Sequence, residues 1–150
     1  MTIKRDCRQV YACGSPFLNE ERNLDMTRTT INAQNAPAAV GPYVHAVMTG
    51  DIVFTSGQLG LIPETGVLVE GVEAQAEQAI KNLAAVLEAA GMTLANVVKT
   101  TVFLADINDF AAINAIYANY FTGDAPARSC VQAAALPKGG LFEIEAIAVK

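Results

Sequence analysis

The stretch from residue 142 to 149, FEIEAIAV, limits the fold most strongly because two kinds of side chain alternate along it. Alternation with a period of two is typical of a β-strand that buries one face. It places Glu143 and Glu145 on one face, and Phe142 and Ile144 on the other. The stretch therefore predicts a half-buried strand that carries two carboxylates.

A second β-prone stretch, residues 127–132, precedes this strand and contains Arg128, the only arginine in the last 120 residues. Pro126 fixes its own φ angle and disfavours helix before it, and residues 136–140, LPKGG, indicate a turn. We therefore expect a C-terminal hairpin. If its polar faces coincide, Arg128 and a glutamate share one space, either as a structural ion pair or as components of a site.

The remaining elements follow from periodicity. β-Branched runs predict strands at 43–48, 52–56 and 97–105. Apolar residues recur every three or four positions from 72 to 90 and again up to about 121, which predicts two amphipathic helices. The order is β-β-α-β-α-β-β, so we expect a single α+β domain in which a mixed sheet carries two helices on one face.

The same periodicity assigns faces. The buried side of the second helix is expected to hold its aromatic and branched residues, Phe110, Ile113, Tyr117, Tyr120 and Phe121. On the strand at 97–105, Val98 and Thr100 are expected under the helices, and Lys99, Thr101 and Phe103 on the opposite face. Because Phe103 is too apolar for a wholly solvated surface, we expect that face to contact another subunit.

Composition and motifs argue against several classes of function. The net charge of −5 disfavours a nucleic-acid partner, since phosphate binding requires clustered Lys and Arg. No apolar run approaches 18 residues, so no membrane span is expected. One histidine argues against a His-rich metal site, and no phosphate loop or dinucleotide glycine motif occurs. Three cysteines do not predict a disulfide framework, so a reduced cytoplasm is the simplest setting.

The N-terminal segment differs from the rest. We expect residues 1–27 to be an N-terminal extension and residues 28–150 to be the domain proper. Up to residue 25 the charges balance, and neither helical nor strand periodicity occurs. The extension also lacks the apolar region of a signal peptide. Two interpretations stay open, a frayed end and an added docking arm.

Two single residues could carry chemistry of their own. His45 is the only candidate for the base of a Ser-His-Asp triad, although a sheet histidine needs no such role. Lys99 could form a Schiff base if desolvated, or lie solvated or paired on its strand. Both alternatives are weaker than the combination of Arg128 with a glutamate, for the following reason.

Four blocks of sequence occur together in one order. They are residues 36–43 (APAAVGPY), 55–58 (TSGQ), 98–104 (VKTTVFL) and a C-terminal group made of 126–131 (PARSCV), 136–138 (LPK) and 143–148 (EIEAIA). In this order they resemble the RidA/YjgF family of reactive-intermediate deaminases. The resemblance covers about residues 28 to 150.

The resemblance implies a fold, an assembly and an activity. Family members have a chorismate-mutase-like fold and form homotrimers with binding clefts between neighbouring chains. They hydrolyse 2-iminobutanoate, 2-iminopropanoate and enamine tautomers such as 2-aminoacrylate to 2-oxo acids and ammonia. No cofactor and no metal is implied, because the imine carbon is already electrophilic.

The roles of individual residues follow from their chemistry and from the resemblance together. The guanidinium of Arg128 can donate two parallel hydrogen bonds to a carboxylate, which suits a small 2-imino or 2-oxo acid. Glu143 would move the protons, with Glu145 as its rival, and the resemblance favours Glu143. It also implies that Cys130 offers its backbone carbonyl rather than its thiol. The other substrate-binding residues that it implies are Tyr43, Ser56, Gly57 and Asn114.

Two departures from the family pattern and one alternative function remain. Phe142 replaces an aliphatic residue and is expected to narrow the pocket, and His45 replaces a more usual polar amide. The alternative function is a non-catalytic trimer that binds a 2-oxo acid or acts like a chaperone. Translation inhibition and RNA cleavage, which are also linked to the family, fit the acidic composition poorly.

Overall fold

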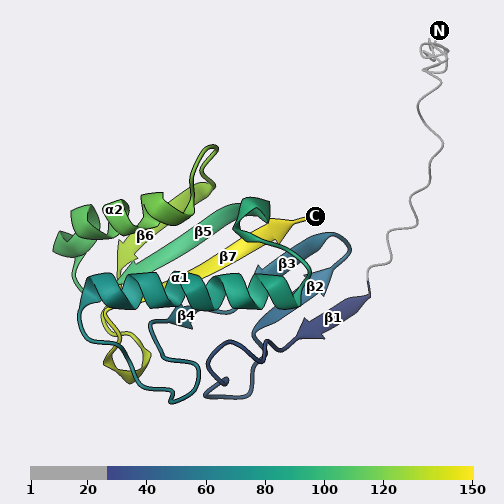
Figure 1. Cartoon of the computed structure of the whole chain (residues 1–150), viewed down its shortest axis with the longest axis horizontal. Coiled ribbons are helices and arrows are strands. Elements are labelled where there is room, and N and C mark those ends of the chain that lie inside the picture. Colours follow the sequence, from purple (N-terminus) through teal and green to yellow (C-terminus); the bar gives the residue numbers. More distant parts are fainter. Residues whose placement is uncertain (1–26) are drawn as a thin grey trace, which may run out of the picture.

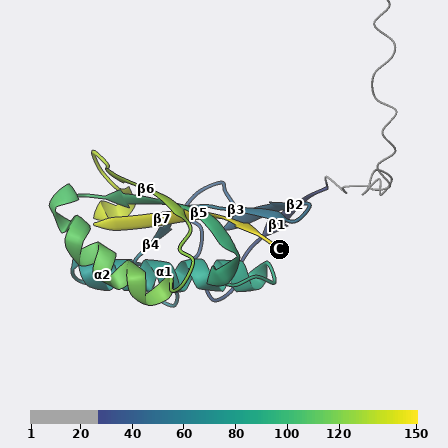
Figure 2. The same ribbon diagram turned by 90° about the horizontal axis from the view of Figure 1, so that it is seen from above.

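The computed structural model describes residues 27–150, which form a single β-sheet with a pair of helices covering one of its faces (Figures 1 and 2). The helices are α1 (Val72–Ala89) and α2 (Phe110–Tyr120). Seen from above, both lie on the same side of the strands, as the sequence predicted. The α+β fold class is confirmed.

Seven strands form the sheet, which is ordered β1-β2-β3-β7-β5-β6 with β4 paired to β7. They are β1 (Arg28–Ile31), β2 (Ala46–Thr49), β3 (Ile52–Thr55), β4 (Gln58–Leu59), β5 (Val97–Leu104), β6 (Ala127–Gln132) and β7 (Phe142–Val149). β1 and β4 were not predicted from the sequence. β6 is parallel to β5, and every other pairing is antiparallel.

The prediction of a C-terminal hairpin is wrong. β5 lies between β6 and β7, so these two strands do not pair with each other. The chain leaves β5, passes through α2 over one face, and returns as β6 parallel to β5, which is the usual path of such a crossover. Residues 136–140 do turn the chain, with a short 3-10 helix at Pro137–Gly139. A turn signal does not say which strands the turn joins, and this one carries the chain across to the other side of β5.

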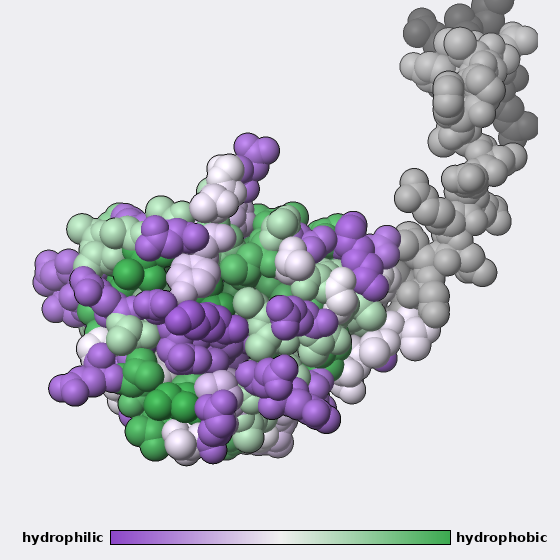
Figure 3. Space-filling model, viewed as in Figure 1, coloured by the Kyte–Doolittle hydropathy of each residue, from purple (hydrophilic) through white to green (hydrophobic). Residues whose placement is uncertain are grey.

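The core lies between the helices and the sheet. The apolar stripe of α1 is buried against the alternate residues of β7 and β5 that face it, among them Phe142, Ile144, Val102 and Leu104. Gly91 ends the helix with φ at 71°, a left-handed conformation that favours glycine. Hydrophilic residues gather over the outer side of α1 (Figure 3). Neither helix of residues 27–150 is long and apolar enough to cross a membrane.

Two face assignments need correction. Val98 is 49% exposed rather than covered, because the register of β5 shifts between Val97 and Lys99 and reverses the alternation there. Phe110 is 40% exposed at the start of α2, whereas Ile113, Tyr117 and Phe121 are buried as predicted. The expected N-terminal extension, apart from Thr27, lies outside the described residues.

Candidate active site

Arg128 lies on the helix side of the edge strand β6 and is held by α2. Its Nη2 donates a hydrogen bond of 2.6 Å to Oδ1 of Asn114. Its Cζ lies 4.6 Å from the ring centroid of Tyr117 and 5.5 Å from that of Phe110. Both are cation–π distances. The guanidinium is therefore oriented by three side chains of a single helix.

The spacing of these three residues explains the arrangement. Phe110, Asn114 and Tyr117 follow one another at four and three positions, so they lie along one side of α2. The Tyr117 hydroxyl lies 2.8 Å from Oγ1 of Thr100, which is fully buried on β5. Asn114 was predicted as a site residue, whereas the aromatic support from Phe110 and Tyr117 was missed. The spacing of Phe110, Asn114 and Tyr117 on one side of α2 could have predicted this support only if the position of Arg128 beside that helix had been known.

Cys130 follows Arg128 on the same face of β6 and is half-buried. Burial raises the pKa of its thiol, and the positive charge of Arg128 opposes this shift without cancelling it. A thiol that is harder to ionise is a poor nucleophile. This agrees with the expectation that its backbone, rather than its sulfur, is offered to a ligand.

Glu143 lies on the helix-free face of the sheet, away from the group around Arg128. It lines a cavity of about 330 Å³ together with Val40, Tyr43, Ser56, Gly57, Leu59 and Pro137. A β-carbon at Gly57 would overlap the carboxylate of Glu143, so only glycine lets the side chain occupy this place. The structure thus brings together four of the predicted residues, namely Tyr43, Ser56, Gly57 and Glu143.

The surroundings of Glu143 favour its neutral form. Burial raises the pKa of its carboxyl, and the negative charge of Glu145 raises it further. A carboxyl with a raised pKa gives up and regains its proton at a higher pH than an ordinary glutamate, which suits a group that moves protons. Glu145 itself lines a separate cavity of about 240 Å³, with Lys99 and Thr101.

Arg128 and Glu143 do not share a space within one chain. Arg128 pairs with Thr100 of β5, which faces the helices, whereas Glu143 pairs with Phe103, which faces away from them. The polar faces of the two strands therefore do not coincide, so the condition for a shared space within one chain is not met. Arg128, Asn114 and Cys130 form one group, and the cavity of Glu143 forms another on the opposite face.

The other candidates have structural partners. His45 is buried and both of its ring nitrogens bond to backbone, so neither is free to act as a base. Lys99 donates a 2.7 Å hydrogen bond to Oγ of Ser129 on the helix-free face. Phe142 is fully buried in the core, so it does not narrow the pocket as expected. No group of three potential metal ligands occurs between residues 27 and 150.

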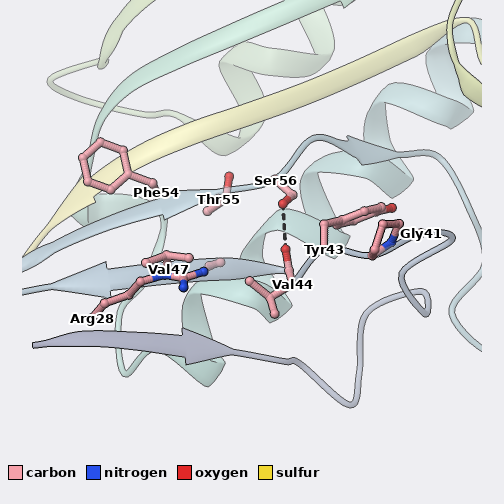
Figure 4. A pocket seen from close by; sticks show the side chains of 10 residues that line it. Arg28, Gly41, Tyr43, Val44, Val47, Phe54, Thr55 and Ser56 are labelled. Carbon is pink, nitrogen blue, oxygen red and sulfur yellow. Dashed lines mark hydrogen bonds between the residues drawn. The ribbon is translucent and has the colours of Figure 1, made fainter.

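A larger hollow of about 650 Å³ adjoins the cavity of Glu143, because Tyr43 and Ser56 line both (Figure 4). Arg28 of β1 and Phe54 of β3 lie along it. Figure 4 shows the hydroxyl of Ser56 bonded to the carbonyl oxygen of Val44, at 2.7 Å. The hollow and the cavity are thus neighbours that share the side chains of Tyr43 and Ser56 as lining.

Comparison with known proteins places this chain in a family. A family model described as endoribonuclease L-PSP matches residues 33–150. The chain is 53% identical over 124 residues to a 2-iminobutanoate/2-iminopropanoate deaminase of Salmonella typhimurium, covering 81% of this chain and 97% of the relative. A protein of Rattus norvegicus with the same name is 54% identical over 124 residues and covers 82% of this chain and 90% of its own.

Solved structures agree with this. RidA from an Antarctic Psychrobacter is 51% identical with a TM-score of 0.80, covering 81% of this chain and 99% of that one. The Escherichia coli YjgF gene product is 50% identical with a TM-score of 0.79 and covers 81% and 98%. Escherichia coli TdcF, solved with bound serine, is 46% identical with a TM-score of 0.79 and covers 81% and 98%. The chain therefore belongs to the endoribonuclease L-PSP family, which is the RidA/YjgF family that its sequence blocks resemble.

Proposed function

We propose that this protein is a cofactor-independent deaminase. It hydrolyses 2-iminobutanoate, 2-iminopropanoate and their enamine tautomers, including 2-aminoacrylate, to 2-oxo acids and ammonia. Such a reaction removes reactive intermediates that would damage pyridoxal-phosphate enzymes. The relatives named as deaminases, at 52 to 54% identity, support the activity. In the molecule itself, the main support is the guanidinium of Arg128. Side chains of α2 orient it, and its planar fork suits a carboxylate.

Arg128 and Glu143 would have to come from different copies of the chain. They lie on opposite faces of one sheet, so a cleft that contains both needs a second copy. The helix-free face exposes large apolar side chains, among them Phe54 on β3 and Val131 on β6, which a contact with another copy would cover. The resemblance adds that the assembly is a homotrimer. Each cleft then joins Arg128, Asn114 and Cys130 of one copy to the cavity of Glu143 in the next.

The chemistry needs only water and a group that moves protons. Arg128 binds the substrate carboxylate, and the backbone carbonyl of Cys130 accepts a hydrogen bond from the attacking water or the amino group. Water adds to the imine carbon and gives a tetrahedral amino alcohol. Glu143 takes a proton from the attacking water and gives it to the imine nitrogen, which completes the amino alcohol. It then moves the hydroxyl proton of this intermediate to the amino nitrogen, so that the carbonyl forms as ammonia leaves. General acid–base help of this kind contributes about 10² to 10⁴ in rate.

The remaining predicted residues shape this cleft. Tyr43, Ser56 and Gly57 form the wall beside Glu143, and Gly57 leaves the space that the carboxylate occupies. The serine bound to Escherichia coli TdcF shows that this relative accepts a small amino acid. A 2-imino acid has the same carboxylate next to a nitrogen-bearing carbon. We place the protein in the cytoplasm, where these intermediates arise.

RNA cleavage, which the family description suggests, is less consistent with the described residues than deamination is. Residues 27–150 hold six Lys and Arg against eleven Asp and Glu, so a basic surface for phosphates is lacking over this range. His45, the only imidazole of the protein, is engaged through both nitrogens and cannot serve as a general base.

The activity is tested by forming 2-iminobutanoate from threonine with a dehydratase, in the presence of semicarbazide as a competing trap. Wild-type protein should speed the release of 2-oxobutanoate, and Arg128→Ala should abolish this. Lys81→Ala removes a cation from the exposed side of α1 and should behave as wild type. No acceleration by folded wild type would refute the deaminase. Retained binding of 2-oxobutanoate would then favour the non-catalytic binder.

A further inference from the structure

The imidazole of His45 joins two segments of backbone. It is 5% exposed, and its Nδ1 accepts a hydrogen bond of 2.9 Å from the N–H of Ala33. Its Nε2 lies 2.9 Å from the carbonyl oxygen of Pro37. An amide nitrogen can only donate and a carbonyl oxygen can only accept, so the ring is neutral and carries its proton on Nε2. Both of its polar atoms are used to hold residues 33–37.

These residues begin the loop that forms one wall of the cavity of Glu143. The chain runs from Pro37 to Val40 and Tyr43, which both line that cavity. Within the loop, the N–H of Val40 donates to the Tyr43 hydroxyl at 3.3 Å. Among the described residues, the backbone of 38–43 forms one further bond, within the loop between Gly41 and Tyr43, and none to the sheet. The loop is therefore anchored mainly through its two ends.

The backbone around His45 holds the opposite wall. The carbonyl oxygen of His45 accepts a hydrogen bond of 2.9 Å from the N–H of Ser56, and that of Val44 accepts one of 2.7 Å from the Ser56 hydroxyl (Figure 4). Ser56 precedes Gly57, the residue that makes room for Glu143. His45 thus links the two walls of the cavity. Its side chain holds the loop that leads to Tyr43, and its main chain holds Ser56, next to Gly57.

We propose that His45 is a positioning residue for the deaminase reaction, because its imidazole fixes residues 33–43 so that Tyr43 stands at a set distance from Ser56 and Glu143. It touches no reacting atom itself. The role rests on the proposed function. Loss of the imidazole releases one wall of the cleft and weakens substrate binding, while the groups that move protons stay in place.

Three variants separate this role from simple destabilisation. His45→Leu keeps an apolar volume but removes both hydrogen bonds. His45→Gln keeps a donor and an acceptor that can reach Pro37 and Ala33. His45→Asn keeps an acceptor near the position of Nδ1 but cannot reach the carbonyl oxygen of Pro37. The order of recovery should therefore be Gln above Asn above Leu.

Two measurements decide the proposal. In the imine assay, His45→Leu should raise KM about 10- to 100-fold with kcat little changed, and His45→Gln should restore KM. A purely structural role would instead reduce the amount of active enzyme, which lowers the apparent kcat and leaves KM unchanged. Hydrogen exchange of the full-length protein should be faster over residues 33–43 in His45→Leu, slow again in His45→Gln, and unchanged over α1.

The outcomes distinguish this role from the activity. An active wild type with unchanged KM and unchanged exchange of residues 33–43 in His45→Leu would overturn the role of His45 alone. A wild type without turnover would overturn the deaminase and this role with it. A rise in KM that His45→Gln fails to correct would also contradict the proposal, because the glutamine amide supplies the same two hydrogen-bonding groups.

Discussion

Arg128 and Glu143, the two charged residues on which the proposed chemistry depends, lie on opposite faces of one sheet. Their partners on β5 show this, since Thr100 beside Arg128 is buried under the helices and Phe103 beside Glu143 faces away from them. A single chain therefore contains both halves of the proposed site but cannot combine them.

Two inactive variants should restore activity when they assemble together. In a trimer of mixed Arg128→Ala and Glu143→Gln chains, a cleft is intact when an unaltered Arg128 meets an unaltered Glu143 of the next copy. Each mixed trimer contains one such cleft, so about one third of wild-type activity is expected. Co-expression with two different tags, purification through both and the imine assay measure it. Each variant alone serves as control, and a mixed assembly as inactive as its parents would show that the site is built otherwise.

Gly57→Ala should damage activity more than stability. The added methyl group overlaps the carboxylate of Glu143, which can swing away because it is the end of a flexible side chain. We expect kcat/KM to fall about 10²-fold with a nearly unchanged melting temperature. Gly123→Ala is the matched control, since Gly123 has φ at 78° with nothing near its Cβ position. That change should cost about 1 kcal/mol of stability and leave activity intact. Equal effects of the two changes on activity would contradict the role of Gly57.

The stability of the protein should depend on the charge of Glu143. Within one copy of the chain, burial and Glu145 raise its pKa, so folding shifts this carboxyl toward its neutral form. The stability from this group is complete below the unfolded pKa and is lost as pH rises through the folded pKa. Glu143→Gln, which is neutral at every pH, should therefore melt higher than wild type at pH 7, with a difference that shrinks toward pH 4. Thermal unfolding across this range tests the sign, and a less stable Gln variant at pH 7 would refute it.

Two substitutions of Tyr117 should separate support of Arg128 from support of the core. Tyr117→Phe keeps the ring under the guanidinium but leaves the buried hydroxyl of Thr100 without its partner, which costs about 1 to 3 kcal/mol of stability. Its KM should stay close to that of wild type. Tyr117→Leu also removes a cation–π contact worth about 0.5 to 2 kcal/mol, so KM should rise about 2- to 30-fold. Steady-state kinetics beside thermal melts measure both, and an equal KM in the two variants would show that the ring does not orient Arg128.

Much of the local structure could be predicted because its causes are local. The alternation of β7, the apolar stripe of α1 and the left-handed Gly91 at its end each depend on neighbours a few residues away. The chemical character of the site was predicted only in part from the residues. The fork of Arg128 indicated an anionic substrate, whereas the resemblance to the RidA/YjgF family was needed to favour Glu143 as the proton carrier over a structural ion pair.

The sequence by itself therefore determined most of the elements, the inward face of most strands and the candidate residues for the proposed chemistry. Only the tertiary structure decided how these were combined. Periodicity says which side chains share a face of one strand, but the relation between two strands depends on the path between them. Because α2 carries the chain back to make β6 parallel to β5, β5 came to separate β6 from β7. The side chains that each strand turns to the helices were then set by its register on β5, and this put Arg128 and Glu143 on opposite faces.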